Sequence, residues 1–416
     1  MDVVGIIGLG YVGLPLAIAF AEQGCPVIGV DVDEERVQML REGRSHIQDV
    51  ASERLAAVAA NLTLTTSQKP LQDASAVIIC VPTPLTRNRE PDLSALLQAS
   101  ASLAQVLRPS QLVVVESTTY PGTTRERVAP LLEASKLEAG VDFHLAFSPE
   151  RVDPGRRDFT LRNTPKVVGG LTEACLQAAS ALYSIICEEI VEVSSPEAAE
   201  LCKLLENIFR SVNIALVNEM ALLSDRMGID IWEVVEAASS KPYGFMSFQP
   251  GPGMGGHCLP VDPFYLSWRA REFGMSCEFV ELAGKINQQM PHHCVAKAQS
   301  ALNDVGLPVR GSKIAVLGVS YKAGVGDVRE SPALEIIRLL AQLGADICYH
   351  DPYVPSLPAL SLHSVGLQEA VDRADLALIV TAHPHVDHEA AIVSAKVVLD
   401  LRGVTRQMPA RNIVRL

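Results

Sequence analysis

The first thirty residues carry the pattern that most restricts the fold of this chain. An apolar segment, Val3 to Ile7, is followed by a glycine-rich turn, an apolar helical segment from Val12 to Gln23, and a second apolar segment, Val27 to Val30. Short apolar segments joined by a helix of this length predict two buried parallel strands and a crossover helix. The chain therefore starts with a β-α-β unit, the building block of a doubly wound parallel sheet.

The turn after the first strand, residues 8–13, reads Gly-Leu-Gly-Tyr-Val-Gly. In this G-x-G-x-x-G arrangement the first glycine permits a tight turn, the second admits a pyrophosphate, and the third lets helix and strand touch. Asp31 follows the second strand, 18 residues beyond Gly13. A carboxylate placed there can bind a ribose 2′-hydroxyl and repel a 2′-phosphate, so the unit predicts a site that prefers NAD to NADP.

Further apolar strands extend the predicted sheet and end in polar residues. Ala76 to Val81 leads into Pro-Thr-Pro at 82–84, and Leu112 to Val115 leads into Glu-Ser-Thr at 116–118. Ligands of doubly wound sheets lie at the carboxyl ends of such strands. We therefore expect these polar residues close to the dinucleotide.

The C-terminal hundred residues repeat the same plan. Lys313 to Gly318 is a strand that ends in a glycine turn, and the strand Ile347 to His350 ends on Asp351, as the earlier strand ends on Asp31. A second Rossmann-like domain is therefore predicted. Because its turn lacks the full glycine fingerprint, a mononucleotide or a sugar nucleotide is favoured there over a dinucleotide.

A long helix is predicted between the two halves. Ser195 is a candidate N-cap with proline at the first helical position, and nothing interrupts the helical pattern before Gly228. One stripe of this helix is apolar and suits a core or a subunit interface, from which we expect a homodimer: Ile208, Val212, Ala215 and Leu222.

The predicted fold class is α/β, with two Rossmann-like doubly wound parallel sheets joined by a long central helical region. The predicted domains are an NAD-binding Rossmann domain at 1–194, a central helical and dimerisation region at 195–305, and a second Rossmann-like domain at 306–416.

Composition limits the partners and the compartment. The 416 residues carry a formal net charge of −13, which argues against nucleic acid or an anionic membrane as the main partner. No apolar run reaches the roughly 18 residues of a membrane span, and no basic leader begins the chain, so a cytoplasmic protein is expected. The nine cysteines form neither a C-x-x-C pair nor a cluster with histidine, so neither a disulfide framework nor a metal site is predicted.

The central helix places three polar residues on one face. Lys203, Asn207 and Arg210 are spaced i, i+4 and i+7. One interpretation is a solvated polar face. The apolar neighbours favour another, because a partly buried lysine beside an amide can hold a proton or stabilise an oxyanion.

Cys258 differs from the other cysteines because it lies in a glycine- and proline-rich loop, residues 249–263. A small residue tolerated in a tight loop is one interpretation. With a lysine to activate it, Asp262 nearby and a nicotinamide site in the same chain, it is a candidate nucleophile for aldehyde oxidation through a thiohemiacetal and a thioester. His257 is adjacent and is expected to shape the loop, since neighbouring residues rarely face each other.

Glu150 follows the predicted strand Phe143 to Phe147, within Ser-Pro-Glu-Arg at 148–151. It is a candidate base for activating water. An exposed loop carboxylate is the competing interpretation.

Together these motifs resemble the UDP-glucose/UDP-mannose-type nucleotide sugar dehydrogenases, in order over nearly the whole chain. The resemblance implies an NAD-binding Rossmann domain, a central dimerisation region and a UDP-sugar-binding domain at 306–416. It also implies two successive NAD-dependent oxidations that convert the C6 alcohol of the sugar to a carboxylate. The motifs that carry it lie at residues 8–13, 81–84, 116–118, 148–151, 203–207, 253–262, 321–322 and 327–331.

The resemblance also assigns roles to residues of this chain. The implied catalytic set has a nucleophile, two groups that stabilise the oxyanion or move a proton, two that handle water, and a carboxylate that supports the lysine: Cys258; Lys203 and Asn207; Glu150 and Thr118; and Asp262. The implied NAD contacts are Gly8, Gly10, Tyr11, Val12, Gly13, Asp31, Arg36, Thr83, Thr118 and Arg329. The implied contacts of the sugar nucleotide are Glu150, Arg151, Lys203, Asn207, Arg210, Tyr243, Gly255, Lys322 and Arg402.

Details of the motifs favour an N-acetylhexosamine as the sugar. Glu150 is followed by arginine, where the UDP-glucose branch has a second glutamate, and histidine precedes Cys258. Segments 82–93 and 242–246 look closest to UDP-N-acetylglucosamine 6-dehydrogenases. The histidine and arginine that UDP-N-acetylmannosamine enzymes carry near the second segment are missing. UDP-glucose and UDP-N-acetylmannosamine stay as alternatives.

Two other functions compete with this one. A two-domain hydroxyacid dehydrogenase would use Lys203 and need no cysteine, but the second Rossmann-like half counts against it. A non-catalytic sensor of NAD or of a nucleotide sugar would keep the fold, but the set of Lys203, Asn207 and Cys258 argues against it.

Overall fold

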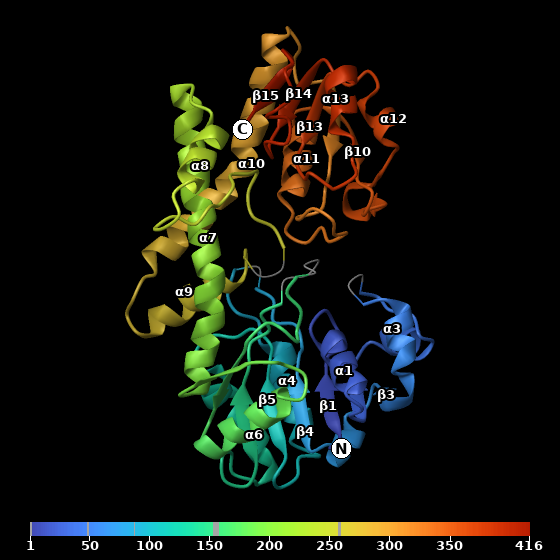
Figure 1. Cartoon of the computed structure of the whole chain (residues 1–416), viewed down its shortest axis with the longest axis vertical. Helices are drawn as coiled ribbons and strands as arrows, with labels where there is room; N and C mark the ends of the chain where they lie inside the picture. Colours follow the sequence, from blue (N-terminus) through green and yellow to red (C-terminus); the bar gives the residue numbers. More distant parts are fainter. Residues whose placement is uncertain (1, 48–49, 87, 153–157, 257–258) are drawn as a thin grey trace. The chain divides into compact units, whose positions relative to one another are not determined.

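The computed structural model of the chain describes residues 2–47, 50–86, 88–152, 158–256 and 259–416. These residues divide into two compact units, whose elements are labelled in Figure 1. The first unit holds the residues up to Glu206 together with Phe264–Ser276, and the second holds Asn207–Pro263 together with Cys277–Leu416. The three domains predicted from the sequence stay a prediction.

The first unit is built on an eight-stranded sheet in the order β3-β2-β1-β4-β5-β6-β7-β8. All neighbouring strands pair parallel except β6 and β7, which pair antiparallel. The doubly wound sheet predicted here is therefore confirmed. The strands are β1 Val4–Ile7, β2 Val27–Val30, β3 Leu62–Thr65, β4 Ala76–Ile79, β5 Leu112–Val115, β6 His144–Phe147, β7 Lys166–Gly170 and β8 Ile190–Val193.

The central strands of this sheet are apolar because helices cover both faces. Every residue of β1, β4 and β5 is buried. Strand β4 ends at Ile79, two residues before the predicted Val81, because the chain turns there and the Cys80 carbonyl lies against Gly8.

The α-helices of this unit before the long central helix are α1 Gly13–Glu22, α2 Glu34–Arg41, α3 Ser52–Ala57, α4 Ser94–Leu103, α5 Ala129–Leu132 and α6 Glu173–Tyr183. Short helical turns are η1 Ala59–Asn61, η2 Lys69–Asp73, η3 Thr124–Val128 and η4 Glu133–Ser135.

The long central helix α7 covers Pro196–Met227, 32 residues, as predicted. The Ser195 hydroxyl accepts a hydrogen bond from the Ala198 amide at 3.2 Å, which confirms the predicted N-cap. The change from the first unit to the second falls inside this helix, after Glu206. The helices that follow are α8 Ile231–Ser239, α9 Asp262–Glu272 and α10 Glu278–Asp304.

The second unit contains a five-stranded sheet in the order β10-β9-β13-β14-β15, with every neighbouring pair parallel. The second Rossmann-like sheet predicted from the internal repeat is therefore confirmed. One core cluster joins residues of α10 and α11 to this sheet. The elements are β9 Lys313–Leu317, α11 Pro332–Gln342, β10 Asp346–His350, β11 Ser356–Leu357, η5 Pro358–Leu360, β12 Leu362–His363, α12 Leu367–Val371, β13 Leu376–Ile379, α13 His388–Ser394, β14 Val397–Asp400 and β15 Ile413–Arg415.

Across the described residues, no helix is both long and apolar enough to cross a membrane. The same part of the chain holds no group of three or more histidine, cysteine, aspartate or glutamate side chains placed to bind a metal ion.

Candidate active site

The glycine turn after β1 leaves room for a ligand at one position only. A Cβ on Gly8, which has a φ of +93°, would lie 2.7 Å from the Cys80 carbonyl oxygen. A Cβ on Gly13 would lie 1.8 Å from the Gly8 carbonyl oxygen, whereas one on Gly10 would meet nothing within 4 Å. The fold therefore needs Gly8 and Gly13, and Gly10 leaves open space beside the backbone. This space fits the diphosphate of NAD, which binds at such a turn before a helix.

Asp31 follows β2 and is only 4% exposed. Its carboxylate accepts a hydrogen bond from the Leu9 amide at 2.8 Å and pairs with the Arg36 guanidinium at 2.9 Å. Two predicted cofactor residues, Asp31 and Arg36, are thus in direct contact at the end of the strand where a dinucleotide ribose is expected. The turn itself carries two more predicted residues, the exposed Tyr11 and the half-buried Val12.

We expect Gly10→Val to weaken NAD binding at least about tenfold while leaving the thermal midpoint of unfolding unchanged. The new side chain enters space that is empty in the chain, and Gly10 does not have a positive φ. The matched variant Gly13→Val should instead lower the midpoint, because its Cβ collides with backbone. Calorimetric titration with NAD and thermal unfolding without NAD separate the two effects. Tight NAD binding by folded Gly10→Val would contradict this placement of the diphosphate.

Thr83 and Thr118, both predicted to contact NAD, lie together at the carboxyl edge of the sheet. The Thr83 hydroxyl donates to the Thr118 carbonyl oxygen at 2.7 Å. The buried Tyr265 hydroxyl donates to the carbonyl oxygens of Thr83 and Pro84, at 2.9 and 3.2 Å. Tyr265 was missed from the sequence, because its partner lies 182 residues away.

Glu150 and Lys203 are in contact in the first unit. The Lys203 ammonium, half-buried on α7, donates to the Glu150 carbonyl oxygen. Arg151 donates to the Pro165 carbonyl oxygen at 2.6 Å and pairs with Glu206 at 2.7 Å. The start of α7 is thus attached to the segment after β6, and three predicted site residues come together there.

A buried charged group beside Glu150 was missed from the sequence. Lys166 is 3% exposed, pairs with the buried Glu116, and lies 3.7 Å from the Glu150 carboxylate. The Tyr183 hydroxyl donates to Glu116 at 2.8 Å. These residues come from β7, α6 and the end of β5, so no local spacing indicates the group. The only signal is a lysine at the start of the apolar segment Lys-Val-Val-Gly-Gly.

Glu200, on the first turns of α7, is a further missed residue and is fully buried. Its carboxylate accepts hydrogen bonds from the amides of Gly122 and Thr124, at 2.6 and 2.9 Å, and from the Thr119 hydroxyl. Burial raises the pKa of Glu200 to about 7, although these hydrogen bonds oppose the rise. Glu200 therefore ties α7 to the loop that carries Thr118.

In the second unit, Asn207 and Asp262 form a buried pair. Asn207 is 6% exposed and Asp262 is 2% exposed. The Asn207 amide nitrogen donates to the Asp262 carboxylate. This contact orients the amide of Asn207, and the predicted support of Lys203 by Asp262 stays a prediction.

The glycine-rich segment that precedes Cys258 contacts other residues of the second unit. The Gly251 amide donates to the Asn218 side-chain oxygen at 2.9 Å. A Cβ on Gly251 would lie 2.8 Å from the Arg402 guanidinium. The loop therefore passes close to the guanidinium of Arg402, one of the predicted sugar-nucleotide residues.

The same segment is held again just before the predicted nucleophile. The Gly256 amide donates to the Arg329 carbonyl oxygen at 2.9 Å. A Cβ on Gly256 would lie 2.8 Å from the ring of Tyr321. Cys258 and His257 lie outside the described residues, so their roles stay predictions.

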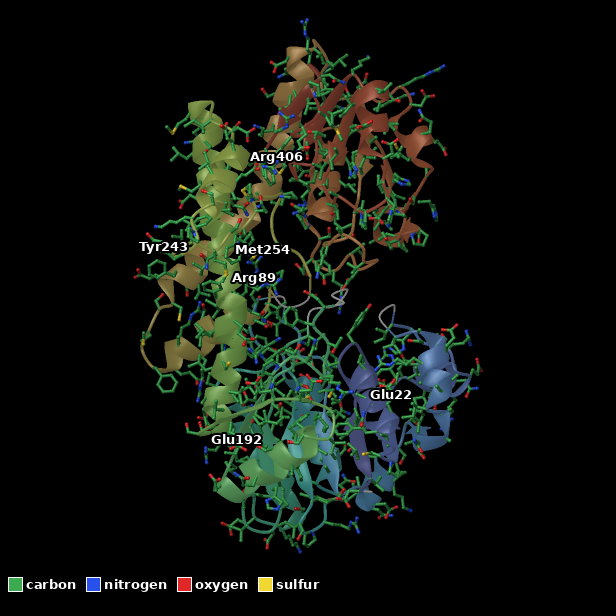
Figure 2. All side chains as sticks on the ribbon, in the orientation of Figure 1. Glu22, Arg89, Glu192, Tyr243, Met254 and Arg406 are labelled. Carbon is green, nitrogen blue, oxygen red and sulfur yellow. The ribbon has the colours of Figure 1, made fainter. Side chains whose placement is uncertain are left out.

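The remaining predicted residues of the second unit differ in exposure. Arg402 is half-buried and donates to the Val380 carbonyl oxygen at 2.7 Å. Arg210 is exposed on α7, and Tyr243, labelled in Figure 2, is 73% exposed. The described chain therefore does not enclose Arg210 or Tyr243. The others are the half-buried Lys322 and Gly255, and the exposed Arg329, which pairs with Asp327 at 2.6 Å.

The glycine turn of the second sheet differs from the first at the position that matters for a diphosphate. Gly318 has a φ of +80°, and Asp351 accepts from the Val319 amide at 2.7 Å, as Asp31 accepts from Leu9. Where the first turn has the open Gly10, the second has Ser320, fully buried and 3.2 Å from the His383 ring. The chain's own side chains fill this space, which supports the expectation that a dinucleotide does not bind there.

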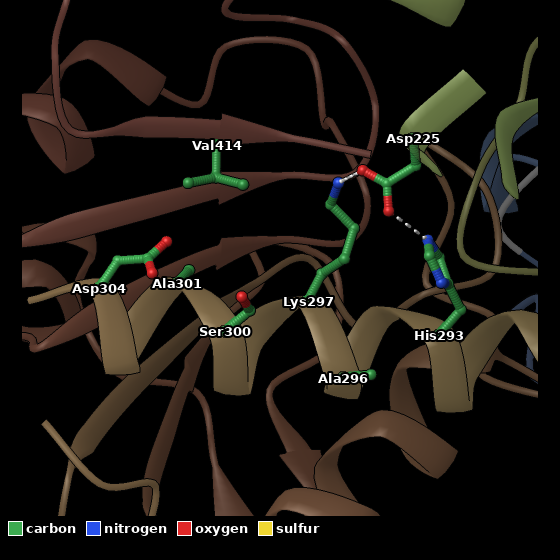
Figure 3. Close-up of a pocket in the computed structure, with 8 residues that line it drawn as sticks. All are labelled: Asp225, His293, Ala296, Lys297, Ser300, Ala301, Asp304 and Val414. Atoms are coloured by element: carbon green, nitrogen blue, oxygen red, sulfur yellow. Dashed lines mark hydrogen bonds and ion pairs between the residues drawn. The ribbon is translucent and has the colours of Figure 1, made fainter. Parts of the chain in front are cut away.

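A polar recess of about 260 Å³ lies elsewhere in the second unit, lined by residues of α7, α10 and β15 (Figure 3). Asp225 pairs with Lys297 and lies 3.7 Å from the His293 ring nitrogen. None of the predicted site residues lines the recess. The ion pair links the end of α7 to α10 and has a structural role.

Three family models match the chain in order, all from the UDP-glucose/GDP-mannose dehydrogenase family. The NAD binding domain matches residues 2–187, the central domain matches 197–289, and the UDP binding domain matches 315–407.

Individual relatives match along almost the whole chain. A UDP-N-acetyl-D-mannosamine dehydrogenase of Pyrococcus horikoshii is 37% identical over 99% of this chain and 98% of its own length. A UDP-N-acetyl-D-glucosamine 6-dehydrogenase of Pseudomonas aeruginosa is 36% identical over 88% of this chain and 85% of its own. Among solved structures, the UDP-D-ManNAc dehydrogenase of P. horikoshii superposes with a TM-score of 0.91, at 35% identity over 99% of this chain and 98% of that one.

Proposed function

The chain belongs to the UDP-glucose/GDP-mannose dehydrogenase family, and we propose that it oxidises the C6 alcohol of a UDP-N-acetylhexosamine to the carboxylate. As a member of this family it is an NAD-dependent oxidoreductase that acts on a UDP-sugar. The motifs around Glu150 and Cys258 favour a UDP-N-acetylhexosamine as the substrate, and segments 82–93 and 242–246 favour UDP-N-acetylglucosamine. The observation that carries the proposal is the hydrogen bond from Lys203 to the backbone carbonyl of Glu150, which brings the lysine proposed to stabilise the oxyanion to the residue proposed to activate water.

NAD, when bound, accepts the hydride in each of the two oxidations. The residues that would hold it are in the first unit: the open turn at Gly10, the Asp31 carboxylate for a ribose, and Thr83 with Thr118 at the sheet edge. Arg329 of the second unit is proposed to join them.

Lys203 is suited to handle the proton and the negative charge that develop at the sugar oxygen. It is half-buried, and its contact with the Glu150 carbonyl oxygen fixes its position. Asn207 can assist, because its amide nitrogen carries two hydrogens and Asp262 binds one of them. The second hydrogen is available to an oxyanion.

The second half of the reaction is assigned to Cys258 and Glu150. The Cys258 thiolate adds to the aldehyde carbon and forms a thiohemiacetal, which becomes a thioester after the second oxidation. Glu150 then activates the water that releases the acid. The sugar nucleotide itself would be bound by the remaining predicted residues, Arg151, Arg210, Tyr243, Gly255, Lys322 and Arg402.

A panel of four substrates tests the proposal: UDP-glucose, UDP-N-acetylglucosamine, UDP-N-acetylgalactosamine and UDP-N-acetylmannosamine. We expect the highest kcat/KM with UDP-N-acetylglucosamine and close to two NADH per sugar consumed. Formation of one NADH per sugar, with an aldehyde product, would contradict the thioester mechanism. Binding of a UDP-sugar and NAD without any NADH would favour a non-catalytic sensor.

UDP-N-acetylmannosamine is the second candidate substrate. The relative that is 37% identical over 99% of this chain carries that activity in its name. The missing histidine and arginine near segment 242–246 argue the other way. The ranking of the two sugars in the same panel decides between them.

We further propose a homodimer formed through α7. In the second unit this helix exposes an apolar stripe at i, i+4, i+7 and i+11, whose members are 38% to 61% exposed: Leu216, Met220, Leu223 and Met227. Large apolar side chains lined up on one helix face are typical of a surface that another chain covers. A cytoplasmic location fits the same proposal, because the eight described cysteines are all free.

Leu223→Glu should therefore convert the dimer to a monomer at micromolar concentration. A charge placed in the middle of the stripe would have to be desolvated in the interface. Light scattering after size-exclusion chromatography measures the mass. Val393→Glu is the matched control, because Val393 on α13 is also exposed, at 86%, and lies outside the stripe. If the wild-type protein were monomeric, or if Leu223→Glu remained dimeric, this stripe would not be the dimer interface.

A further inference from the structure

Lys166 is a buried cation that has no role in the reaction proposed above. Its side chain is 3% exposed, and its ammonium pairs with Glu116, donates to the Pro149 carbonyl oxygen at 3.2 Å, and lies 3.7 Å from the Glu150 carboxylate. Glu116 is in turn bound by the Tyr183 hydroxyl at 2.8 Å. Lys166 therefore joins a fully buried carboxylate to the proposed water-activating one.

The sheet topology explains this contact. Strands β6 and β7 are the antiparallel pair of the first sheet, with Ala146 opposite Gly170 and Phe147 opposite Gly169. Continuing that register beyond the last ladder pair brings Glu150 level with Lys166. A parallel β7 would direct its first residue to the opposite edge of the sheet, away from the end of β6. Because β7 is antiparallel to β6, its first residue, Lys166, lies at the carboxyl edge of the sheet, beside the predicted site residues.

Lys166 keeps its charge in this position. Burial alone would lower the pKa of Lys166, but the carboxylates of Glu116 and Glu150 outweigh burial and raise it. Among the residues that the structure describes, no second cation pairs with the Glu150 carboxylate. The Lys203 ammonium is bound to the Glu150 carbonyl oxygen. The thiols nearby stay neutral, because burial raises the pKa of Cys187 to about 11 and that of Cys80 also.

We propose that Lys166 is a positioning residue that holds the Glu150 carboxylate in place for the release of the acid. This inference rests on the proposed function. In the step concerned, water adds its oxygen to the thioester carbonyl carbon, the carbon–sulfur bond breaks, and the sulfur leaves as the Cys258 thiolate. One water proton passes to the Glu150 carboxylate, and the acid product loses the other. A cation that binds the carboxylate fixes the position from which it accepts this proton.

Lys166→Met tests this role in single-turnover and steady-state assays with NAD and the preferred UDP-sugar. We expect the first two NADH per active site to form within about threefold of the wild-type rate. Steady-state turnover should fall about thirtyfold, a part of the roughly 100- to 10,000-fold that a positioned base supplies. Intact-protein mass should show the acyl group accumulated on the enzyme.

Lys166→Arg should restore most of the turnover, since it keeps the charge. Lys396→Met is the control, because Lys396 forms a comparable ion pair, 2.7 Å from Asp375, on the surface of the second unit. If Lys166→Met does not fold, the double variant Glu116→Gln with Lys166→Met removes the cation without leaving Glu116 as an unpaired buried charge.

Three results would overturn the proposal. The first is an equal loss in the NADH burst and in steady-state turnover, the second is no recovery of turnover in Lys166→Arg, and the third is full activity of the folded variant. A wild-type enzyme that forms no NADH with any UDP-sugar would instead contradict the proposed function. The wild-type control therefore separates the two failures.

Discussion

Cys258→Ser is expected to lower steady-state NADH formation at least about 1,000-fold, the scale on which enzymes lose activity when their nucleophile is removed. At neutral pH a serine hydroxyl is far less ionised than a cysteine thiol, so the covalent addition to the aldehyde fails. Without the thiohemiacetal the second oxidation cannot proceed. Stopped-flow measurement of NADH and analysis of the sugar product record how far the reaction goes.

The control for this prediction is Cys277→Ser. Cys277 is a half-buried, free cysteine at the start of α10, and the Cys277→Ser variant is expected to keep wild-type activity within about twofold. If Cys258→Ser still formed two NADH per sugar at the wild-type rate, the thioester route would be wrong. The reaction would then need a hydrated aldehyde as the second substrate.

Lys203→Met should reduce kcat about 100- to 1,000-fold, the range measured when one oxyanion-stabilising donor is lost. The variant keeps much of the apolar stem, so the packing of α7 should change little. It loses the ammonium that we assign to the developing oxyanion, and it also loses the hydrogen bond to the Glu150 carbonyl. Both oxidations and the release of the acid are therefore expected to slow, unlike in Lys166→Met, where the first two NADH form normally.

Lys69→Met is the matched control, because Lys69 is an exposed lysine of the same unit outside the predicted site. We expect unchanged kcat for this variant and unchanged thermal midpoints for both. A Lys203→Met enzyme that retained its kcat and showed only a raised KM would reassign Lys203 to substrate binding.

The local elements of this fold follow closely from the sequence. The central helix was predicted from an N-cap at Ser195 to the breaker Gly228, and it spans Pro196–Met227. Strand β5 was predicted at Leu112–Val115 and found there. Helix caps, helix breakers and apolar runs determine these features, and each of these signals spans only a few residues. The end of β4 was less well predicted, because an apolar run continues after the strand has left the ladder.

The site was predictable only where its residues belong to a local motif. The spacing of the glycines at residues 8–13 predicts the geometry of that turn, and the structure adds that Gly10 is the position with open space beside its backbone. Glu150 and Lys203 were named from the sequence, but their contact depends on how α7 packs beside the segment after β6. Lys166 was not named at all, because neither composition nor spacing distinguishes it from other lysines.

The sequence by itself determined the two parallel sheets, the long helix, the dinucleotide turn and the candidate catalytic residues, because each of these depends on side chains close together in the chain. Only the tertiary structure decided which charges meet. Because β7 runs antiparallel to β6, Lys166 lies between Glu116 and Glu150. In the glycine turn of the second sheet, the buried Ser320 takes the position that Gly10 leaves open in the first sheet. Such contacts join residues from separate elements, and burial then strengthens them by removing the water that would screen their charges.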